Sequence, residues 1–260
     1  MKKLPELTML QLELQGPVAT VWLNRPDSRN ALNLAMCREI TAVCEALDAD
    51  DAVRVVVVRA RGAVFCAGAD LKERQGFSTA DLVARRVEGF TAYGALEALS
   101  KPVIAAVQGP AFGSGGEIAA ACDFVLATTQ AAFKYPEVGW GTVGATQRLP
   151  RIVGRRMAKE LLFTGRVVDA QEALDLGLVN HVYAPEAFDA RIAEMAAQIA
   201  AANPLTVQLT KHSIDEGLDT TREGAMAIEL LAIQKNLRHS DWQKAIAGFG
   251  AKEGTDAAAR

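Results

Sequence analysis

The chain has 260 residues, half of them hydrophobic, which is enough for one sizeable core with room for a small appended subdomain. Its formal net charge of −3 gives no basic excess of the kind that binds nucleic acid or an anionic membrane. The apolar runs are too short to span a bilayer, and the basic opening at residues 1–3 lacks the apolar stretch of a signal peptide.

Cysteine and histidine usage points to a reduced protein without a metal site. The four cysteines are scattered and form no Cys-x-x-Cys pair, which favours buried free thiols in a cytoplasmic compartment. The three histidines, His181, His212 and His239, lie far apart in the sequence and lack the spacing of metal ligands. We therefore interpret each as a surface or core histidine.

The first part of the chain predicts a hairpin, a helix and a buried strand. Residues 10–14 alternate apolar and polar side chains, and residues 18–23 continue as a second strand after a Gly-Pro turn. Asn30 or Asn33 is the candidate cap of a helix that runs to about Leu47. The valine run at 53–58 predicts a strand that is buried on both faces.

Two turns of small residues, 62–70 and 109–116, dominate the middle of the chain, and each follows a predicted strand. The elements predicted around them are a helix over 71–99 that breaks near Gly76, a strand at 103–107, a short helix ending near Cys122 and a strand at 124–127. Strands that alternate with helices indicate an α/β fold.

The rest of the chain is predicted to be mainly helical. Its elements are a short apolar piece at 131–133, a glycine-rich loop at 139–144, a helix at 149–163, a second helix from Val167 to Leu176 with Gly177 after it, a strand at 179–183 and helices from Pro185 onward, with breaks at Asn203-Pro204 and Gly217. We predict a core domain over residues 1–184, which carries the site, and a helical region over 185–260.

Three familiar motifs can be tested on the second turn, and each fails. A dinucleotide loop starting at Gly113 needs glycine where Ile118 stands, and a nucleophile elbow around Ser114 needs glycine where Phe112 stands. A phosphate loop needs a Gly-Lys-Ser/Thr ending, which is missing. The turn therefore offers backbone donors and one acid, Glu117, without an obvious nucleophile.

In a parallel sheet, the two turns would meet at one edge, where the strands end. One N–H group from each turn could then converge on a carbonyl oxygen, and Glu117 and Glu137 are available nearby. Two acids beside an oxyanion hole suit proton transfer next to a carbonyl. The alternative is that the glycines serve packing, that Glu117 only complements the helix dipole and that Glu137 is a solvated acid.

A set of short pieces carries a resemblance to a known family. They are Asn24-Arg-Pro with Asn30-Ala-Leu-Asn33, Phe65-Cys-Ala-Gly-Ala-Asp-Leu-Lys72, Lys101-Pro-Val-Ile-Ala-Ala-Val107, Gly109-Pro-Ala-Phe-Gly-Ser-Gly-Gly-Glu117, Cys122-Asp123, Phe133, Pro136-Glu137, Thr146-Gln-Arg-Leu-Pro-Arg151, Leu162-Phe-Thr-Gly165, Ala173 and Gly177-Leu-Val179. In this order and spacing, the chain resembles the enoyl-CoA hydratase/isomerase (crotonase) superfamily over nearly its whole length. The resemblance implies a spiral of ββα units with a helical C-terminal region.

The resemblance also implies roles for four residues. The backbone N–H groups of Ala69 and Ser114 would hold a thioester carbonyl; many members have glycine at the second position, but the donor there is the backbone. Members that add water have two glutamates, which match Glu117 and Glu137. On this interpretation Glu117 activates the water that attacks the β-carbon, and Glu137 delivers a proton at the α-carbon. The predicted activity is reversible hydration of a 2-enoyl-CoA.

Further residues would bind the substrate by the same resemblance. Those implied are Ala67, Asp70, Leu71, Lys72, Gly115, Trp140 and Lys252. Lys252 lies in Phe249-Gly-Ala-Lys252, which looks like a family segment that meets a CoA phosphate, although a solvated tail lysine explains it equally well. No metal and no redox cofactor is implied, because coenzyme A is part of the substrate.

The loop after Glu137 departs from the family pattern. It is shorter than in many members and carries Trp140, which indicates an altered acyl pocket or an aromatic acyl group. The alternatives are therefore another crotonase-type reaction, either isomerisation or hydration followed by retro-aldol cleavage, and a catalytically poor member that binds acyl-CoA. The resemblance implies homotrimers or pairs of trimers. Apolar residues between Met226 and Ile233 would pack there or in the chain's own core.

Overall fold

The computed structural model describes residues 6–240 and 242–247, and the chain divides into two compact units, Met1–Ala201 and Ala202–Arg260. The division lies after Ala201 and not after residue 184, where we placed it from the sequence. The reason is helix α6 (Pro185–Ala200), which buries Phe188 and Ile192 against the strands of the first unit. The predicted contact of Lys252 lies outside the described residues.

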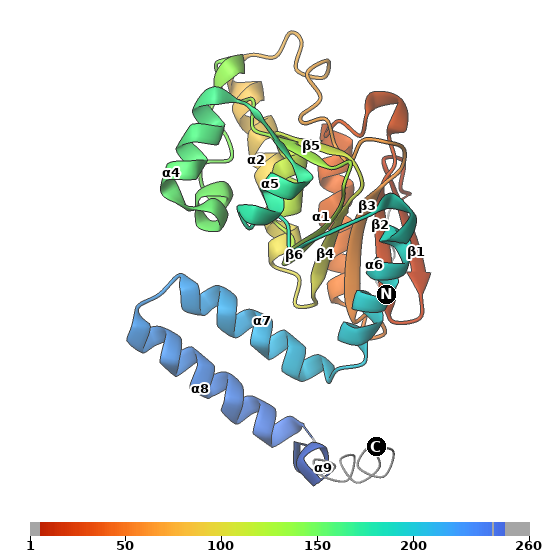
Figure 1. The fold of residues 1–260 in the computed structure, drawn as a ribbon, viewed down its shortest axis with the longest axis vertical. Coiled ribbons are helices and arrows are strands. Elements are labelled where there is room, and N and C mark those ends of the chain that lie inside the picture. The colour runs from red at the N-terminus through yellow and green to blue at the C-terminus, as the bar shows by residue number, and fades with distance from the viewer. Residues whose placement is uncertain (1–5, 241, 248–260) are drawn as a thin grey trace. The chain divides into compact units, whose positions relative to one another are not determined.

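The first unit is built on a six-stranded sheet (Figure 1). Its strands, in spatial order, are β1 (Leu10–Gln15), β2 (Val18–Leu23), β3 (Val55–Ala60), β4 (Val103–Val107), β6 (Phe124–Thr128) and β9 (His181–Tyr183). β1 and β2 form the predicted antiparallel hairpin, and every later neighbour pairs in parallel. The carboxyl ends of β3 and β4 therefore lie at the same edge of the sheet, as the site requires.

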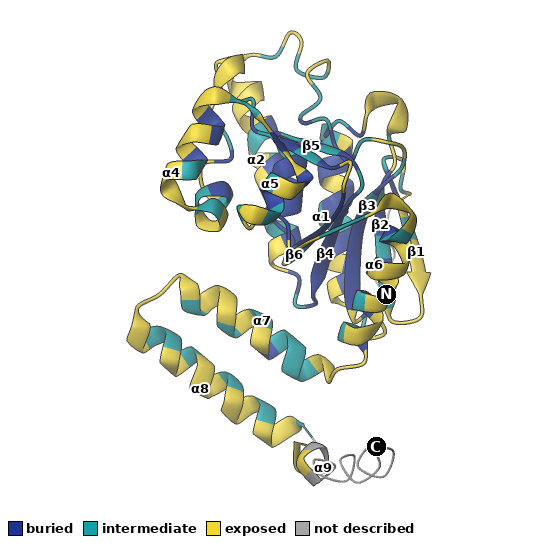
Figure 2. Ribbon diagram, in the orientation of Figure 1, coloured by how far each residue is buried: buried dark blue, intermediate teal, exposed yellow. Residues whose placement is uncertain are grey.

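The valine run of β3 is buried on both faces, as predicted from its sequence. Because side chains alternate along a strand, Val56 and Val58 face one layer of the core and Val55 and Val57 face the other. The first layer contains buried residues of helices α1 (Leu34–Asp48) and α2 (Thr79–Glu97), and the second contains those of α6. Figure 2 shows the dark, buried strands between exposed outer helix faces.

A smaller sheet lies next to two of the candidate residues, because Ser114 comes shortly after its first strand along the chain and Glu137 comes shortly after its second. It contains β5 (Pro110–Phe112), β7 (Ala132–Lys134) and β8 (Val167–Asp169), with β7 in the centre. The prediction of a helix starting at Val167 was wrong, because Val168 is buried opposite Phe133 as a strand partner. The helix α5 (Ala170–Asp175) begins only after Asp169, whose side chain caps it.

The remaining elements complete both units. They are the short helices η1 (Pro26–Ser28) and η2 (Val138–Trp140), the helices α3 (Ser114–Ala120) and α4 (Arg148–Thr164) of the first unit, and α7 (Pro204–Leu218), α8 (Arg222–His239) and α9 (Trp242–Ala247) of the second. Within the second unit, α7 packs against α8, and Thr206 donates a hydrogen bond to Asn236. Among the described helices, none is long and apolar enough to cross a membrane.

Asn30 and Asn33, the two candidate cap residues of α1, have different structural roles. Asn33 caps the helix, because its side chain accepts a hydrogen bond from the backbone N–H of Met36. Asn30 is fully buried and donates to the carbonyl oxygens of Arg61 and Val64, so it anchors the first small-residue turn. The helix predicted over 71–99 begins only at Thr79, where Ser78 and Asp81 form a capping box.

We predict that Gly115→Ala destabilises the first unit strongly. A Cβ at Gly115 would lie 2.4 Å from the carbonyl oxygen of Cys66, so the two turns would have to separate. The expected loss in the free energy of unfolding is about 2 kcal/mol or more, measured by denaturant titration. The control is Gly139→Ala, where nothing lies within 4 Å of the added Cβ. Equal losses in the two variants would contradict the proposed contact.

Candidate active site

The first turn aims the backbone N–H of Ala69 away from its neighbouring loop. Ala69 forms a parallel bridge with Leu32, in which the carbonyl of Gly68 and the N–H of Asp70 both bond to Leu32. In a parallel bridge with this pattern, the backbone N–H of Ala69 points away from Leu32. No acceptor for it is found within residues 6–240 and 242–247, so the group is available to a ligand.

The second turn brings the N–H of Ser114 close to the first. Cys66 of the first turn forms a parallel bridge with Ala111 of the second. A Cβ added at Gly113 would lie 3.9 Å from the Cα of Gly68, and a Cβ added at Gly68 would lie 3.2 Å from the carbonyl oxygen of Phe112. Ser114 is the first residue of α3, where backbone N–H groups have no partner inside the helix. The two predicted donors therefore lie on loops in van der Waals contact.

Glu117 projects from α3 into the protein interior. Its side chain is buried, and its Oε2 accepts a hydrogen bond of 3.2 Å from Arg148. Arg148 is in turn held by two hydrogen bonds of 2.6 Å to Glu97. The buried Oε1 of Glu117 has no hydrogen-bond partner among the described residues. One oxygen of the carboxylate is thus fixed by Arg148, and the other remains able to accept a hydrogen bond from a ligand or water.

Glu137 reaches the same place from β7. Because β7 pairs with β5, the N–H of Gly113 bonds to the carbonyl of Lys134, and the chain then carries Glu137 over Gly113. A Cβ at Gly113 would lie 3.2 Å from the Oε1 of Glu137, and the φ of +49° at Gly113 also favours glycine there. The buried Oε2 of Glu137 likewise lacks a partner in the described part of the chain. Orphaned buried carboxylate oxygens are rare unless they serve a ligand or water.

Burial raises the pKa of both carboxyl groups above the ordinary value for glutamate. For Glu117, the Arg148 guanidinium opposes this rise, and the charge of Glu137 adds to it. For Glu137, a backbone hydrogen bond and the charge of Arg86 oppose it, although Arg86 forms no ion pair with it. Glu117 thus has a cation hydrogen-bonded to it, whereas Arg86 acts on Glu137 only through its charge.

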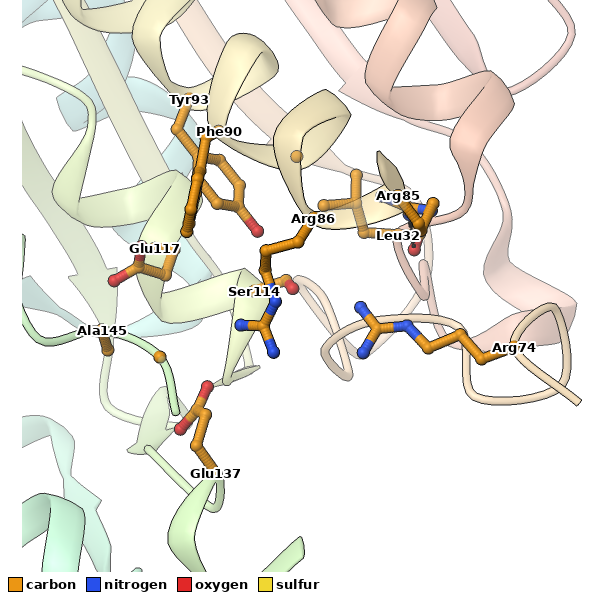
Figure 3. Close-up of a pocket in the computed structure, with 12 residues that line it drawn as sticks. Leu32, Arg74, Arg85, Arg86, Phe90, Tyr93, Ser114, Glu117, Glu137 and Ala145 are labelled. Atoms are coloured by element: carbon orange, nitrogen blue, oxygen red, sulfur yellow. Dashed lines mark hydrogen bonds between the residues drawn. The ribbon is translucent and has the colours of Figure 1, made fainter. Parts of the chain in front are cut away.

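The pocket between these groups has a volume of about 380 Å³, including the solvent at its mouth. Its lining residues are Leu32, Arg74, Arg85, Arg86, Gly89, Phe90, Tyr93, Ser114, Glu117, Glu137, Gly144 and Ala145. Figure 3 shows the Glu137 carboxylate turned towards the Arg86 guanidinium. Ser114 and the Tyr93 hydroxyl lie near the Arg86 side chain in the same view. Two acids and a backbone donor in one pocket can polarise a carbonyl and move protons next to it.

The thiol of the first turn is not part of this chemistry. Burial raises the pKa of Cys66 to about 12, so at neutral pH it is a thiol and a poor nucleophile. Burial also raises the pKa of Tyr93 and Tyr135, which keeps both phenols protonated. Cys66, Tyr93 and Tyr135 are therefore all uncharged at neutral pH.

The structure places the other predicted site residues around the first turn and beyond it. Asp70 forms an ion pair with Arg25 and accepts hydrogen bonds from the N–H groups of Lys72 and Glu73. Leu71 and Lys72 are exposed, Ala67 is half-buried, and Gly115 is buried against Cys66. None of these residues lines the pocket. Trp140 is 69% exposed and lies outside the lining as well.

The residues missed from the sequence include three that line the pocket, Arg74, Arg86 and Tyr93, and the partner of Glu117, Arg148. Arg86 and Tyr93 lie seven positions apart on α2, so they project from one face of the helix, which is a detectable spacing. No such pattern marks Arg74, and Arg148 meets Glu117 only through the tertiary fold. No group of three or more side chains that could hold a metal ion is found in the part of the chain that the structure describes.

The chain is similar to known proteins over most of its length. The family model described as enoyl-CoA hydratase/isomerase matches residues 13–256. A probable mitochondrial enoyl-CoA hydratase 2 of Arabidopsis thaliana is 41% identical over 90% of this chain and 79% of its own. The crotonyl-CoA hydratase of Syntrophomonas wolfei is 38% identical over 92% and 93%, respectively.

Solved structures agree on the fold. The crystal structure of an enoyl-CoA hydratase from Bacillus anthracis superposes with a TM-score of 0.91 and is 32% identical, covering 94% of this chain and 97% of its own. An enoyl-CoA hydratase from Mycobacterium smegmatis also has a TM-score of 0.91, at 34% identity over 94% and 97%. The fold predicted from the sequence resemblance is confirmed by these neighbours.

We predict that Arg148→Gln raises the pKa of the Glu117 carboxyl further. The guanidinium stabilises the ionised carboxylate, so its removal leaves burial and the charge of Glu137 unopposed. Titration of ¹³C-labelled glutamate carboxyl groups by NMR would measure the shift. In the wild type, both Glu117 and Glu137 should titrate above the ordinary value of 4.5. The control is Arg155→Gln, an exposed arginine on the same helix, and an unchanged Glu117 titration in Arg148→Gln would contradict the assigned contact.

Proposed function

The chain belongs to the enoyl-CoA hydratase/isomerase family, and we propose that it is an enoyl-CoA hydratase, which adds water reversibly across the 2,3 double bond of an enoyl-CoA thioester. The observation that carries this proposal is the pair of buried carboxylates, Glu117 and Glu137, which face one pocket, each with an oxygen that has no hydrogen-bond partner among the described residues. A water molecule held between two acids needs such free acceptor positions.

The backbone N–H groups of Ala69 and Ser114 hold the thioester carbonyl. When oxygen adds at C3, the π electrons of the double bond move towards the thioester, and negative charge develops on its carbonyl oxygen. Two N–H groups fixed by the loop contact stabilise this enolate without reorganising during the reaction. Loss of one such donor typically costs about 10²–10³ in rate. Since the donors are backbone groups, their placement depends on the glycines that let the turns meet.

The surroundings of the two acids assign their roles. Glu117 is bonded to Arg148, which favours its ionised form, so it takes the proton from water while the oxygen bonds to C3. Glu137 has no ion pair in the described chain and its pKa is raised by burial, so it gives its proton to C2. Water supplies both the hydroxyl and, through the exchange of protons between the two acids, the hydrogen. No oxidant, metal or further co-reactant is needed for this balance.

We further propose that the protein acts as a homo-oligomer, a trimer or a pair of trimers, in the cytoplasm and without a cofactor other than the coenzyme A of its substrate. Helix α8 supports the first part, because Met226, Leu230, Leu231 and Ile233 are each about half exposed or more. A row of exposed apolar side chains is typical of an interface. The free, buried cysteines support a reducing compartment, although some relatives are named mitochondrial.

We predict that Glu137→Gln and Glu117→Gln each lower the turnover of a short 2-enoyl-CoA by about 10²–10⁴-fold, because each removes one proton-transfer group. The conjugated thioester absorbs in the ultraviolet and its hydrated product does not, so loss of absorbance measures the reaction. Binding of the acyl-CoA, measured by calorimetry, should change far less. The matched control is Glu194→Gln, an exposed glutamate whose only ion pair is with Arg191 within the described chain.

Three outcomes would overturn the proposal. A wild-type protein that binds the thioester but leaves its absorbance unchanged would point to the acyl-CoA-binding alternative. A Glu137→Gln variant with full turnover would show that the two-acid arrangement is not the catalytic one. Appearance of a free aldehyde together with a shortened acyl-CoA would identify the hydratase-lyase reaction.

A further inference from the structure

Three guanidinium groups line the same pocket as the two acids, which is more positive charge than the proposed hydration uses. Arg85 is accounted for by the fold itself. It is buried and paired with Glu73, and it also donates to the carbonyl oxygen of Leu32. Arg74 and Arg86 have no such acidic partner within the described chain, so they are the cations that remain to be explained.

Arg74 is held in the pocket with part of its guanidinium unsatisfied. Its Nε is buried and has no hydrogen-bond partner among the described residues. Burial lowers the pKa of Arg74, and the charges of Arg86 and Arg85 lower it further. Figure 3 shows its guanidinium turned towards that of Arg86. A buried donor without an acceptor costs about 1–3 kcal/mol, so a structure tolerates it mainly where a ligand completes it.

Arg86 faces the same space from α2. Its Nη2 donates a hydrogen bond of 2.8 Å to the hydroxyl of Thr142, which fixes the side chain. Its Nη1 points to Gly144, where an added Cβ would lie 3.1 Å from Nη1 and 2.9 Å from the Cγ of Glu137. Arg86 therefore lies beside the catalytic acid, and it approaches Arg74 on its other side.

Two like charges that converge at a partly buried place repel each other unless an anion lies between them. Arginine guanidinium groups bind carboxylates in a forked geometry, with several donors in one plane. The position of the two arginines indicates which part of the substrate supplies the anion. Ser114, Glu117 and Glu137 line this pocket, so it receives the reacting end of the substrate, whereas Leu71 and Lys72 of the predicted coenzyme A channel lie outside it.

We propose that Arg74 and Arg86 bind a carboxylate at the far end of the acyl chain, so that the preferred substrate is a short 2-enoyl-CoA with a terminal carboxylate. This inference rests on the proposed hydratase function and names its substrate class. The two arginines and the two acids share one small pocket, so few carbon atoms separate the double bond from the carboxylate. Phe90 lines the same pocket and offers an apolar contact to those carbon atoms.

The bound carboxylate also assists the proton transfer. The charge of Arg86 lowers the pKa of Glu137, which works against its role as a proton donor. An anion bound to Arg86 offsets this charge and favours the protonated form of Glu137. A substrate whose carboxylate neutralises the arginines therefore also keeps Glu137 protonated, which is the form that donates a proton. A purely apolar acyl chain would leave both guanidinium groups desolvated and unpaired.

The test compares two substrates with five acyl carbons each, 4-carboxybut-2-enoyl-CoA and pent-2-enoyl-CoA. We expect kcat/KM for the wild-type protein to favour the carboxylated substrate by about 10- to 100-fold, since hydrogen bonds between charged groups are made with only one of the two. Arg86→Leu and Arg74→Leu should each lower this ratio by about tenfold or more. The matched control is Arg38→Leu, an exposed arginine outside the pocket, which should leave the ratio unchanged.

A binding measurement keeps the test independent of how the variants fold. For the wild-type protein, 4-carboxybutanoyl-CoA should bind at least about tenfold more tightly than pentanoyl-CoA, as measured by calorimetry. Inhibition by free coenzyme A separates the acyl carboxylate from the coenzyme's phosphates. If the leucine variants weaken free coenzyme A as much as the carboxylated thioester, the arginines hold a phosphate and the inference is overturned.

The remaining outcomes separate this inference from the proposed function. Equal or better hydration of pent-2-enoyl-CoA by the wild-type protein would overturn the inference and leave the hydratase function in place. Hydration of neither thioester, together with preferential binding of 4-carboxybutanoyl-CoA, would overturn the function and retain the carboxylate site. A substrate ratio that stays the same in both leucine variants would assign the preference to other residues and overturn the role of Arg74 and Arg86.

Discussion

The contact between the two small-residue turns is the constraint on which the rest of the site depends. Cys66 bridges Ala111 in parallel, and Gly115 lies so close to Cys66 that a Cβ there would be 2.4 Å from its carbonyl oxygen. Only glycine lets the backbones approach to this distance. Because the turns are fixed to each other, the N–H groups of Ala69 and Ser114 are held on two loops whose separation is set by this contact.

The same contact organises the acids. Glu117 lies one helical turn after Ser114, so its position follows from the second turn, and Glu137 is carried over Gly113 by the pairing of β5 with β7. Their chemistry then diverges through their neighbours. Arg148 is anchored by Glu97 and bonds to Glu117, whereas Glu137 keeps an oxygen without a hydrogen-bond partner among the described residues and feels only the charge of Arg86. In the proposed mechanism, this difference makes one of two identical side chains the base and the other the acid.

The arginines show how selectivity can be added to such a framework without altering it. Arg74 and Arg86 lie on the segment between β3 and β4, in the turn after the first loop and on α2, and neither contributes to the bridge that holds the loops. A carboxylate bound there would place one negative charge between the two guanidinium groups, which form no ion pair within the described chain. Substrate choice and proton transfer are then coupled through a single electrostatic contact, because Arg86 acts on Glu137 as well as on the substrate.

The sequence by itself determined the strands of the six-stranded sheet, the burial of the valine strand and the two turns, because these depend on local periodicity and on glycines at defined positions, whereas the pair of acids was identified through the family resemblance. It failed at Val167, where burial opposite Phe133 outweighs local helical preference. It also failed at Arg148, Arg86 and Arg74. The positions of these side chains depend on contacts between residues distant in the chain, such as Arg148 with Glu117, which no local pattern encodes. Only the tertiary structure decided which acid has a cation bonded to it and which charges share the pocket, because electrostatic interactions depend on distance in space and on burial.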